Sequence, residues 1–238
     1  MRRWLVGLLL VGVVAVSDAD SPSLSAVFQG YVRNGKVDYA GIRQNRRKEL
    51  QAFVLSLANA EVGALKKTEQ VAFWLNAYNG LVVSQIVENQ GTPESVFSRG
   101  GFFRKARYQV AGAWRSLDDI EHKALRPLAQ DPRIHFVLVC GAQSCPPLRA
   151  SAFLGSQDLE ESLEQAAFAY INDPDKVSLD RPNHRLILNK IFDWYAQDFG
   201  DVVQFVARYR TPEERAWLTQ GPVKVEFRDY DWHLNQAR

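Results

Sequence analysis

Residues 68–91 read TEQVAFWLNAYNGLVVSQIVENQG, and this stretch decides the fold. Thr68 is a typical N-cap residue, and the negative charge of Glu69 suits the positive end of a helix dipole. Apolar side chains fill most of the positions that follow, so we predict one long helix. A helix with so little polar surface has to be buried, which makes it the expected centre of the domain.

Two asparagines interrupt the apolar run of this helix. Asn76 and Asn79 are three residues apart and therefore share one helix face, which also takes in Ala72 and Val83. Asparagine is a poor helix former, and a buried amide needs hydrogen-bond partners. Two interpretations stay open. The amides hold the backbone of a nearby loop, or one of them orients a catalytic histidine or lines a pocket.

The flanking sequence predicts further helices and several short strands. Ser116 is followed by Asp119 in a near capping box, and Pro127 is expected to end the helix that begins there. Residues 133–141 form a continuous apolar run, which predicts a buried strand. Hairpin turns are predicted at residues 34–35, 111–112 and 182–183, and other helices over residues 42–57, 156–171, 190–199, 201–210 and 211–221. The predicted fold class is α+β, with several helices packed on a small, mostly antiparallel sheet in one domain.

The N-terminus has the pattern of a secretory signal peptide. It reads MRRWLVGLLLVGVVAVSDAD, with a basic start, an apolar run and small residues before a cleavage site near Ala19. The apolar run is about 13 residues long, shorter than the about 20 that span a membrane. We predict a signal peptide over residues 1–19, a lead-in over 20–36 and a single domain over 37–238. An uncleaved N-terminal anchor stays open as the alternative.

The charge balance bears on possible partners. The chain has 238 residues, 46% hydrophobic and 24% charged, which is ordinary globular composition. Without residues 1–19, 27 basic residues remain against 26 acidic ones. Because nucleic-acid binding needs a concentrated basic face, we expect no nucleic-acid partner. We expect a periplasmic or secreted protein, with no stable membrane span after signal cleavage.

Both cysteines of the chain lie in residues 133–149, RIHFVLVCGAQSCPPLR. On a strand, His135 and Cys140 point to opposite faces, whereas Cys145 follows in a loop that can fold back towards His135. Three interpretations stay open: a Cys140–Cys145 disulfide, a functional thiol at Cys145 activated by His135, and inert buried cysteines. Two cysteines and one histidine fall short of a four-ligand zinc site, so we expect no metal.

The remaining chemistry-bearing residues give weaker signals. His122 is expected to be exposed and without a role. Asp193 and Asp198 are five residues apart on one short helix and do not share a face, which disfavours a two-carboxylate glycosidase. The chain has no phosphate loop, dinucleotide fingerprint or metalloprotease motif, so we expect no cofactor.

Six separated motifs resemble a known family in their order along the chain. They are AFWLNAYNGLVV, SLDDIEHKALR, DPRIHFVLVCGAQSCPPLR, AFAYINDPDKV, KIFDWYAQDF and YDWHLN. Their order is similar to that of the family called domain of unknown function 547, over about residues 37–235. The resemblance implies that His135, Cys140, Cys145, Asn76 and Asn79 belong to the family pattern. It implies no activity, substrate or catalytic residue.

Two hypotheses of function follow, and whether the protein is an enzyme stays open. In the first, Cys145 is the nucleophile of a loosely papain-like thiol hydrolase or acyltransferase, with His135 as base and Asn76 or Asn79 as the orienting amide. In the second, a Cys140–Cys145 disulfide staples a non-catalytic envelope module that binds an unknown peptide, glycan or protein ligand. The redox state of the cysteines and the surroundings of His135 distinguish the two.

Overall fold

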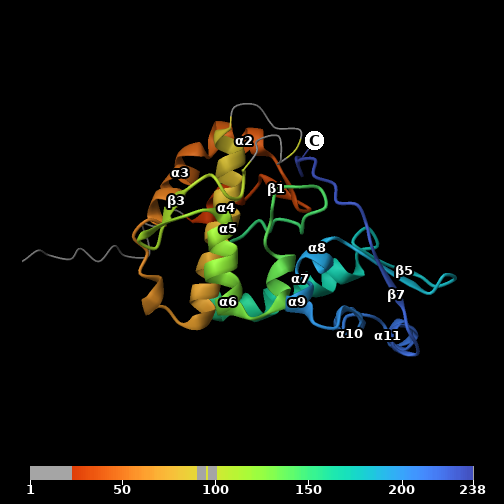
Figure 1. Cartoon of the computed structure of the whole chain (residues 1–238). Helices are drawn as coiled ribbons and strands as arrows, with labels where there is room; N and C mark the ends of the chain where they lie inside the picture. Colours follow the sequence, from red (N-terminus) through yellow and green to blue (C-terminus); the bar gives the residue numbers. More distant parts are fainter. Residues whose placement is uncertain (1–22, 90–94, 96–100, 238) are drawn as a thin grey trace, which may run out of the picture.

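The computed structural model of the protein describes residues 23–89, 95 and 101–237 (Figure 1). The predicted signal peptide lies outside these residues. The fold class is α+β as predicted, with helices and small sheets that are mostly antiparallel. In place of one sheet, the described residues form three small sheets of two, two and three strands. None of the described helices combines the length and apolar character that a membrane span requires.

The predicted central helix is confirmed as α4 (Lys67–Glu88). It begins two residues earlier than an N-cap at Thr68 predicts, because Lys66 is the N-cap and its backbone N–H donates to the Glu69 carboxylate at 2.9 Å. At Gly80 a Cβ atom would lie 2.3 Å from the ring of Phe53. The missing side chain therefore lets α3 (Arg47–Ser56) pack closely against α4.

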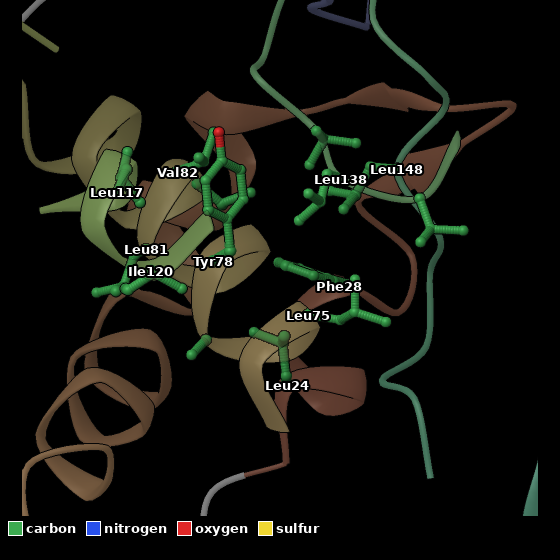
Figure 2. Packing of buried hydrophobic residues seen from close by; sticks show 14 of the residues in the cluster. Leu24, Phe28, Leu75, Tyr78, Leu81, Val82, Leu117, Ile120, Leu138 and Leu148 are labelled. Carbon is green, nitrogen blue, oxygen red and sulfur yellow. The ribbon is translucent and has the colours of Figure 1, made fainter. Parts of the chain in front are cut away.

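The N-terminal elements cover α4 on several sides (Figure 1). They are α1 (Leu24–Phe28), the β1–β2 hairpin (Val32–Arg33 and Lys36–Val37), α2 (Tyr39–Asn45), η1 (Val62–Ala64) and the β3–β4 hairpin (Tyr108–Val110 and Ala113–Arg115). Both hairpin turns lie where the sequence predicts them. Figure 2 shows the core around α4, where Tyr78 lies between Ile120 on one side and Leu138 on the other.

A continuous helical segment follows, made of α5 (Leu117–Asp119), the π-helix η3 (Ile120–Leu125) and α6 (Arg126–Ala129). The capping box is confirmed, since Ser116 Oγ accepts from the Asp119 N–H at 3.0 Å and Asp119 accepts from the Ser116 N–H at 2.9 Å. The prediction that Pro127 ends this helix is wrong. Proline is tolerated there because it lies in the first turn of α6, directly after the wider π turns.

The predicted strand over residues 133–141 is also wrong. Residues Pro132–Phe136 form the 3₁₀-helix η4, which starts where the Asp131 side chain accepts a hydrogen bond from the backbone of Arg133 at 2.9 Å. An irregular segment follows, and its backbone is paired with a side chain of α4 rather than with a strand. The segment is buried as predicted, but the alternation of faces between His135 and Cys140 does not apply.

The C-terminal half forms a second hydrophobic cluster around Phe136. Its ring lies 4.8 Å from the ring of Tyr170 and 5.6 Å from that of Phe192, measured between centroids. Within this half, β5 (Val177–Asp180) and β6 (Arg185–Leu188) pair in antiparallel fashion, and β6 and β7 (Lys224–Phe227) pair in parallel. Its elements are η5 (Gly155–Gln157), α7 (Leu159–Asn172), β5 (Val177–Asp180), β6 (Arg185–Leu188), α8 (Ile191–Trp194), α9 (Ala196–Phe199), α10 (Val202–Ala207), α11 (Pro212–Thr219) and β7 (Lys224–Phe227).

After β7 the chain returns to the N-terminal half (Figure 1). Gln236 bridges to Val37 in β2, and Leu234 bridges to Ala142 in the loop between the two cysteines. Asn235 accepts a hydrogen bond from the Tyr39 hydroxyl at 2.6 Å. The tail over residues 230–237 therefore joins the first hairpin to the cysteine loop.

Candidate functional site

A pocket of about 440 Å³ opens where η3, the cysteine loop, α8 and the tail meet. Most of its lining is apolar, and aromatic side chains predominate. Glu121 and the two cysteines also line it. The aromatic residues of the lining are Tyr78, Phe102, Phe103, Trp194, Tyr195, Tyr230 and Trp232.

Three of these rings pack together and form one side of the pocket, which we call the aromatic wall: Trp194, Tyr230 and Trp232. Trp194 lies 4.7 Å from Tyr230 and 5.5 Å from Trp232, and Tyr230 lies 4.4 Å from Trp232, measured between ring centroids. The indole of Trp194 is still 46% exposed. The wall therefore combines fixed rings with an accessible aromatic surface.

Local hydrogen bonds position the wall. Asn189 accepts at 3.0 Å from the backbone N–H of Ile191, the first residue of α8, which is the helix that carries Trp194. The same side chain donates to the carbonyl of Ser144 at 3.1 Å. The backbone N–H of Ser144 donates to the carbonyl of Asp231, at 3.1 Å, between the two tail residues of the wall. The cysteine loop thereby fixes both α8 and the tail.

Glu121 is a buried carboxyl at this pocket. It lies on the π-helix η3, and its residue is 6% exposed. Burial raises the pKa of the carboxyl above its usual value, although the hydroxyls of Tyr195 and Tyr78 act in the opposite direction as hydrogen-bond donors. None of the residues that the structure describes pairs with the Oε1 atom. A buried polar atom without a protein partner calls for an explanation, such as a bound water, ion or ligand.

The two tyrosines beside Glu121 stay protonated. Burial, the negative charge of Glu121 and its hydrogen bond raise the pKa of the Tyr195 hydroxyl far above its usual range, and burial raises that of Tyr78 as well. Both hydroxyls are therefore neutral hydrogen-bond donors throughout the physiological pH range. The two donors stabilise the charged form of the carboxyl once it loses its proton.

His135 belongs to a chain of polar side chains behind the pocket. Its Nε2 atom lies 2.7 Å from Asp198 Oδ2, and Arg126 binds the two oxygens of Asp198 at 2.8 Å each. Burial lowers the pKa of His135 to about 4, while the hydrogen bond with Arg126 lowers that of Asp198 to about 2. At neutral pH the imidazole is therefore neutral and donates its Nε2–H to a carboxylate. The ring also stacks on Tyr195, with 3.8 Å between centroids.

Cys140 and Cys145 form a disulfide, with Cα atoms 6.1 Å apart. Of the three interpretations of these cysteines, the disulfide is the one confirmed. The Tyr230 hydroxyl lies 3.3 Å from Cys140 Sγ, so the disulfide also contacts the aromatic wall. Within the described ranges, no group of three or more histidine, cysteine or acidic side chains is placed to hold a metal ion.

The two asparagines of α4 hold backbone segments. Asn79 donates to the carbonyl of Val137 at 2.9 Å and accepts from the N–H of Val139 at 3.0 Å. Asn76 makes the same pair of bonds, both 2.9 Å long, with the backbone of Phe153. Neither asparagine belongs to the pocket lining, whereas His135 and Cys145 do. Catalytic roles for these four residues stay predictions.

Sequence reasoning missed Glu121, the most distinctive polar group of the pocket. The hydroxyls that stabilise its charged form come from Tyr78 of α4 and from Tyr195, which is far away in the sequence, so no local pattern reveals it. His122, expected to have no role, also lines the pocket. The sequence places Trp194, Tyr195 and Asp198 on one short segment, but it does not show that this segment faces η3.

The disulfide gives a first testable expectation. We expect reduction to lower the free energy of unfolding by about 2 kcal/mol, because the bond closes a short loop whose chain entropy is released in the unfolded state. Denaturant unfolding with and without reductant measures this change. A Cys140→Ser, Cys145→Ser double variant is the control and should not respond to reductant. Alkylation with mass readout of the untreated protein should find no reactive thiol, and a reactive thiol would contradict the pairing.

Residues 62–171 match the family model described as "Protein of unknown function, DUF547". The chain therefore contains a DUF547 domain over these residues, which run from η1 to α7 and include Glu121, His135 and both cysteines. The aromatic wall lies beyond the matched segment. No curated protein and no solved structure was found to match the chain.

Proposed function

We propose that the protein is a binding module whose aromatic pocket takes a small organic ligand or one unit of a peptide or glycan. The pocket carries the proposal, because about 440 Å³ falls within the range of about 300–1,000 Å³ of small-molecule sites. Such sites are mainly apolar and contain a few polar groups that fix orientation. Glu121, with its unpartnered oxygen, is a polar group of this kind.

The construction of the pocket supports binding by a preformed site. The disulfide fixes the cysteine loop, Asn189 ties that loop to α8, and residues 230–237 pair with it through backbone hydrogen bonds. A site whose walls are already ordered loses little conformational freedom when a ligand binds. The binding module is thus favoured over an enzyme that acts through Cys145.

The thiol hydrolase or acyltransferase is a second candidate, favoured by the presence of His135, Cys140 and Cys145 around one pocket. Two observations weigh against it. Both sulfur atoms are in a disulfide, and His135 is buried with its Nε2 atom bonded to Asp198. Acyl transfer or amide hydrolysis by Cys145 would require prior reduction of the disulfide. This candidate therefore ranks below the binding module.

We further propose that the protein is periplasmic or secreted. The signal-peptide pattern of residues 1–19 supports this location, and a disulfide in a chain with two cysteines suits an oxidising compartment. A peptide, glycan or protein of the cell envelope would then be the source of the ligand.

A fragment screen by ligand-observed NMR tests the binding function. We expect fragments to bind the oxidised protein, and Trp194→Ala and Trp232→Ala to weaken their binding about 10-fold, as expected for loss of an aromatic contact of 1–2 kcal/mol. Trp114→Ala is the matched control, because this tryptophan is 67% exposed on β4 and does not line the pocket.

Two results would count against the binding module. One is a screen in which no fragment responds to the Trp194 and Trp232 substitutions. The other is turnover of acyl or peptide substrates by the reduced protein that disappears in Cys145→Ser, which would establish the thiol enzyme instead.

A further inference from the structure

We propose that the pocket binds a small organic cation bearing an alkylammonium group, with Glu121 as its counter-ion. The inference rests on the proposed binding function and names the ligand class for the same pocket. It stands on the pairing of the charged groups around the pocket, on the unpartnered oxygen of Glu121 and on the aromatic lining.

The charges around the pocket leave one carboxyl to be balanced. Asp118 is paired with Arg104 at 3.4 Å, and Asp198 is paired with Arg126 at 2.8 Å. Glu121 forms no ion pair within 4.0 Å among the described residues, so the group carries one net negative charge when Glu121 ionises. A ligand with a single positive charge balances it.

His135, the buried histidine at the pocket, does not supply that positive charge at neutral pH. His135 donates from Nε2 to Asp198, and burial keeps its imidazole neutral above pH about 4. His122 lies with Nδ1 2.8 Å from Arg126 Nη1 and with Nε2 3.7 Å from Asp118 Oδ1, so both of its nitrogens face groups other than Glu121. Among the residues that the structure describes, none forms an ion pair with Glu121, so a ligand cation would supply the missing charge.

The shape and chemistry of the lining suit an ammonium group. Glu121 Oε1 is buried and has no partner among the described residues, and an N–H of the ligand would supply one. The hydroxyls of Tyr78 and Tyr195 are already placed to stabilise the ionised carboxyl. Aromatic faces attract cations, so the lining favours a charged group over a neutral one of the same size.

Binding of the cation is therefore linked to loss of a proton. Without ligand, burial favours the protonated carboxyl, and the incoming charge reverses that preference. The affinity for a cation of fixed charge should rise with pH through the titration of Glu121. Tyr78, Tyr195, His122 and Arg126 surround the carboxyl, and of these the two tyrosines and Arg126 keep their protonation state in this range.

Isothermal titration calorimetry with benzylammonium and benzyl alcohol tests the inference, because the two probes differ mainly in charge. We expect benzylammonium to bind at least about 10-fold more tightly at pH 7, as a charge-assisted hydrogen bond predicts. The affinity for benzylammonium should rise with pH, whereas that for benzyl alcohol should not. Glu121→Gln should remove both the preference and the pH dependence, whereas Glu161→Gln, at an exposed position of α7, should change neither.

Further measurements distinguish failure of the cation proposal from failure of the proposed binding function. If Glu121→Gln does not fold, Tyr195→Phe takes its place and should lower the preference for the cation. Tetramethylammonium, which has no N–H, should bind more weakly than benzylammonium. Equal affinity for benzylammonium and benzyl alcohol, or an unchanged preference in Glu121→Gln, overturns the inference but leaves the binding module in place. Absence of binding by both probes overturns the inference, and the module also fails if the fragment screen finds no ligand.

Discussion

Replacing Asn79 by alanine is expected to lower the free energy of unfolding by about 4 kcal/mol, because two buried backbone groups lose their partner at once. The amide of Asn79 is 3% exposed and bonds the carbonyl of Val137 and the N–H of Val139. These bonds replace the ladder that a strand would have provided to this segment. Urea denaturation measures the change.

Asn76→Ala is the matched control for that experiment. It removes the same pair of hydrogen bonds, here to Phe153, from a side chain that is only partly buried. Water can reach the released groups more easily, so we expect a loss of about 1–2 kcal/mol. Equal losses in the two variants, or a loss below about 1 kcal/mol for Asn79→Ala, would show that the two hydrogen bonds of Asn79 do not hold residues 137–139 in place.

The second large effect is a dependence of stability on pH through His135. Burial lowers the pKa of His135 in the folded protein from 6.5 to about 4. Between these values the unfolded chain binds a proton that the folded protein does not, so the free energy of unfolding falls as the pH falls. The loss amounts to about 3 kcal/mol from pH 7 to pH 4.

Two neighbouring carboxyls also make the free energy of unfolding depend on pH, one of them in another pH range and the other with the opposite sign. Asp198 has its pKa lowered to about 2, so the stability it contributes is lost only as the pH falls below about 4. The raised pKa of Glu121 has the opposite sign, since its contribution is complete at low pH and is lost as the pH rises through the folded value. The total profile therefore mixes several groups.

A His135→Gln variant isolates the histidine. Glutamine does not titrate, and its amide N–H can still donate to Asp198. The difference in the free energy of unfolding between the natural chain and this variant should change by about 3 kcal/mol between pH 7 and pH 4. A difference that stays constant over this range would contradict the burial of a neutral imidazole.

The sequence predicts those elements whose signals are local. The length of α4, the hairpin at Asn34–Gly35 and the capping box at Ser116 depend on neighbouring residues, and the structure contains all three. The run over residues 133–141 has the composition of a strand, but its backbone pairs with the side chain of Asn79. Asn79 and its partner Val137 are 58 residues apart in the sequence. The sequence predicts that Pro127 ends its helix, but the π-helix η3 directly upstream accommodates the proline, which the local sequence does not show.

The candidate site is less predictable because its parts are distant in sequence. The spacing of Cys140 and Cys145 allowed a disulfide but did not distinguish it from a free thiol. Asp198, the partner of His135, is 63 residues away along the chain. The raised pKa of Glu121 results from burial inside the folded protein, and a sequence pattern records neither the burial nor the missing partner of Oε1.

The return of the tail to the first hairpin has a consequence for the order of folding. The hydrogen bond between Tyr39 and Asn235 joins residues 196 positions apart, and Tyr230 and Trp232 complete one side of the pocket. During synthesis, α4 and its neighbours leave the ribosome well before these residues do. The nascent protein therefore carries an incomplete pocket until translation reaches the tail, and contacts of such long sequence separation form late and slowly.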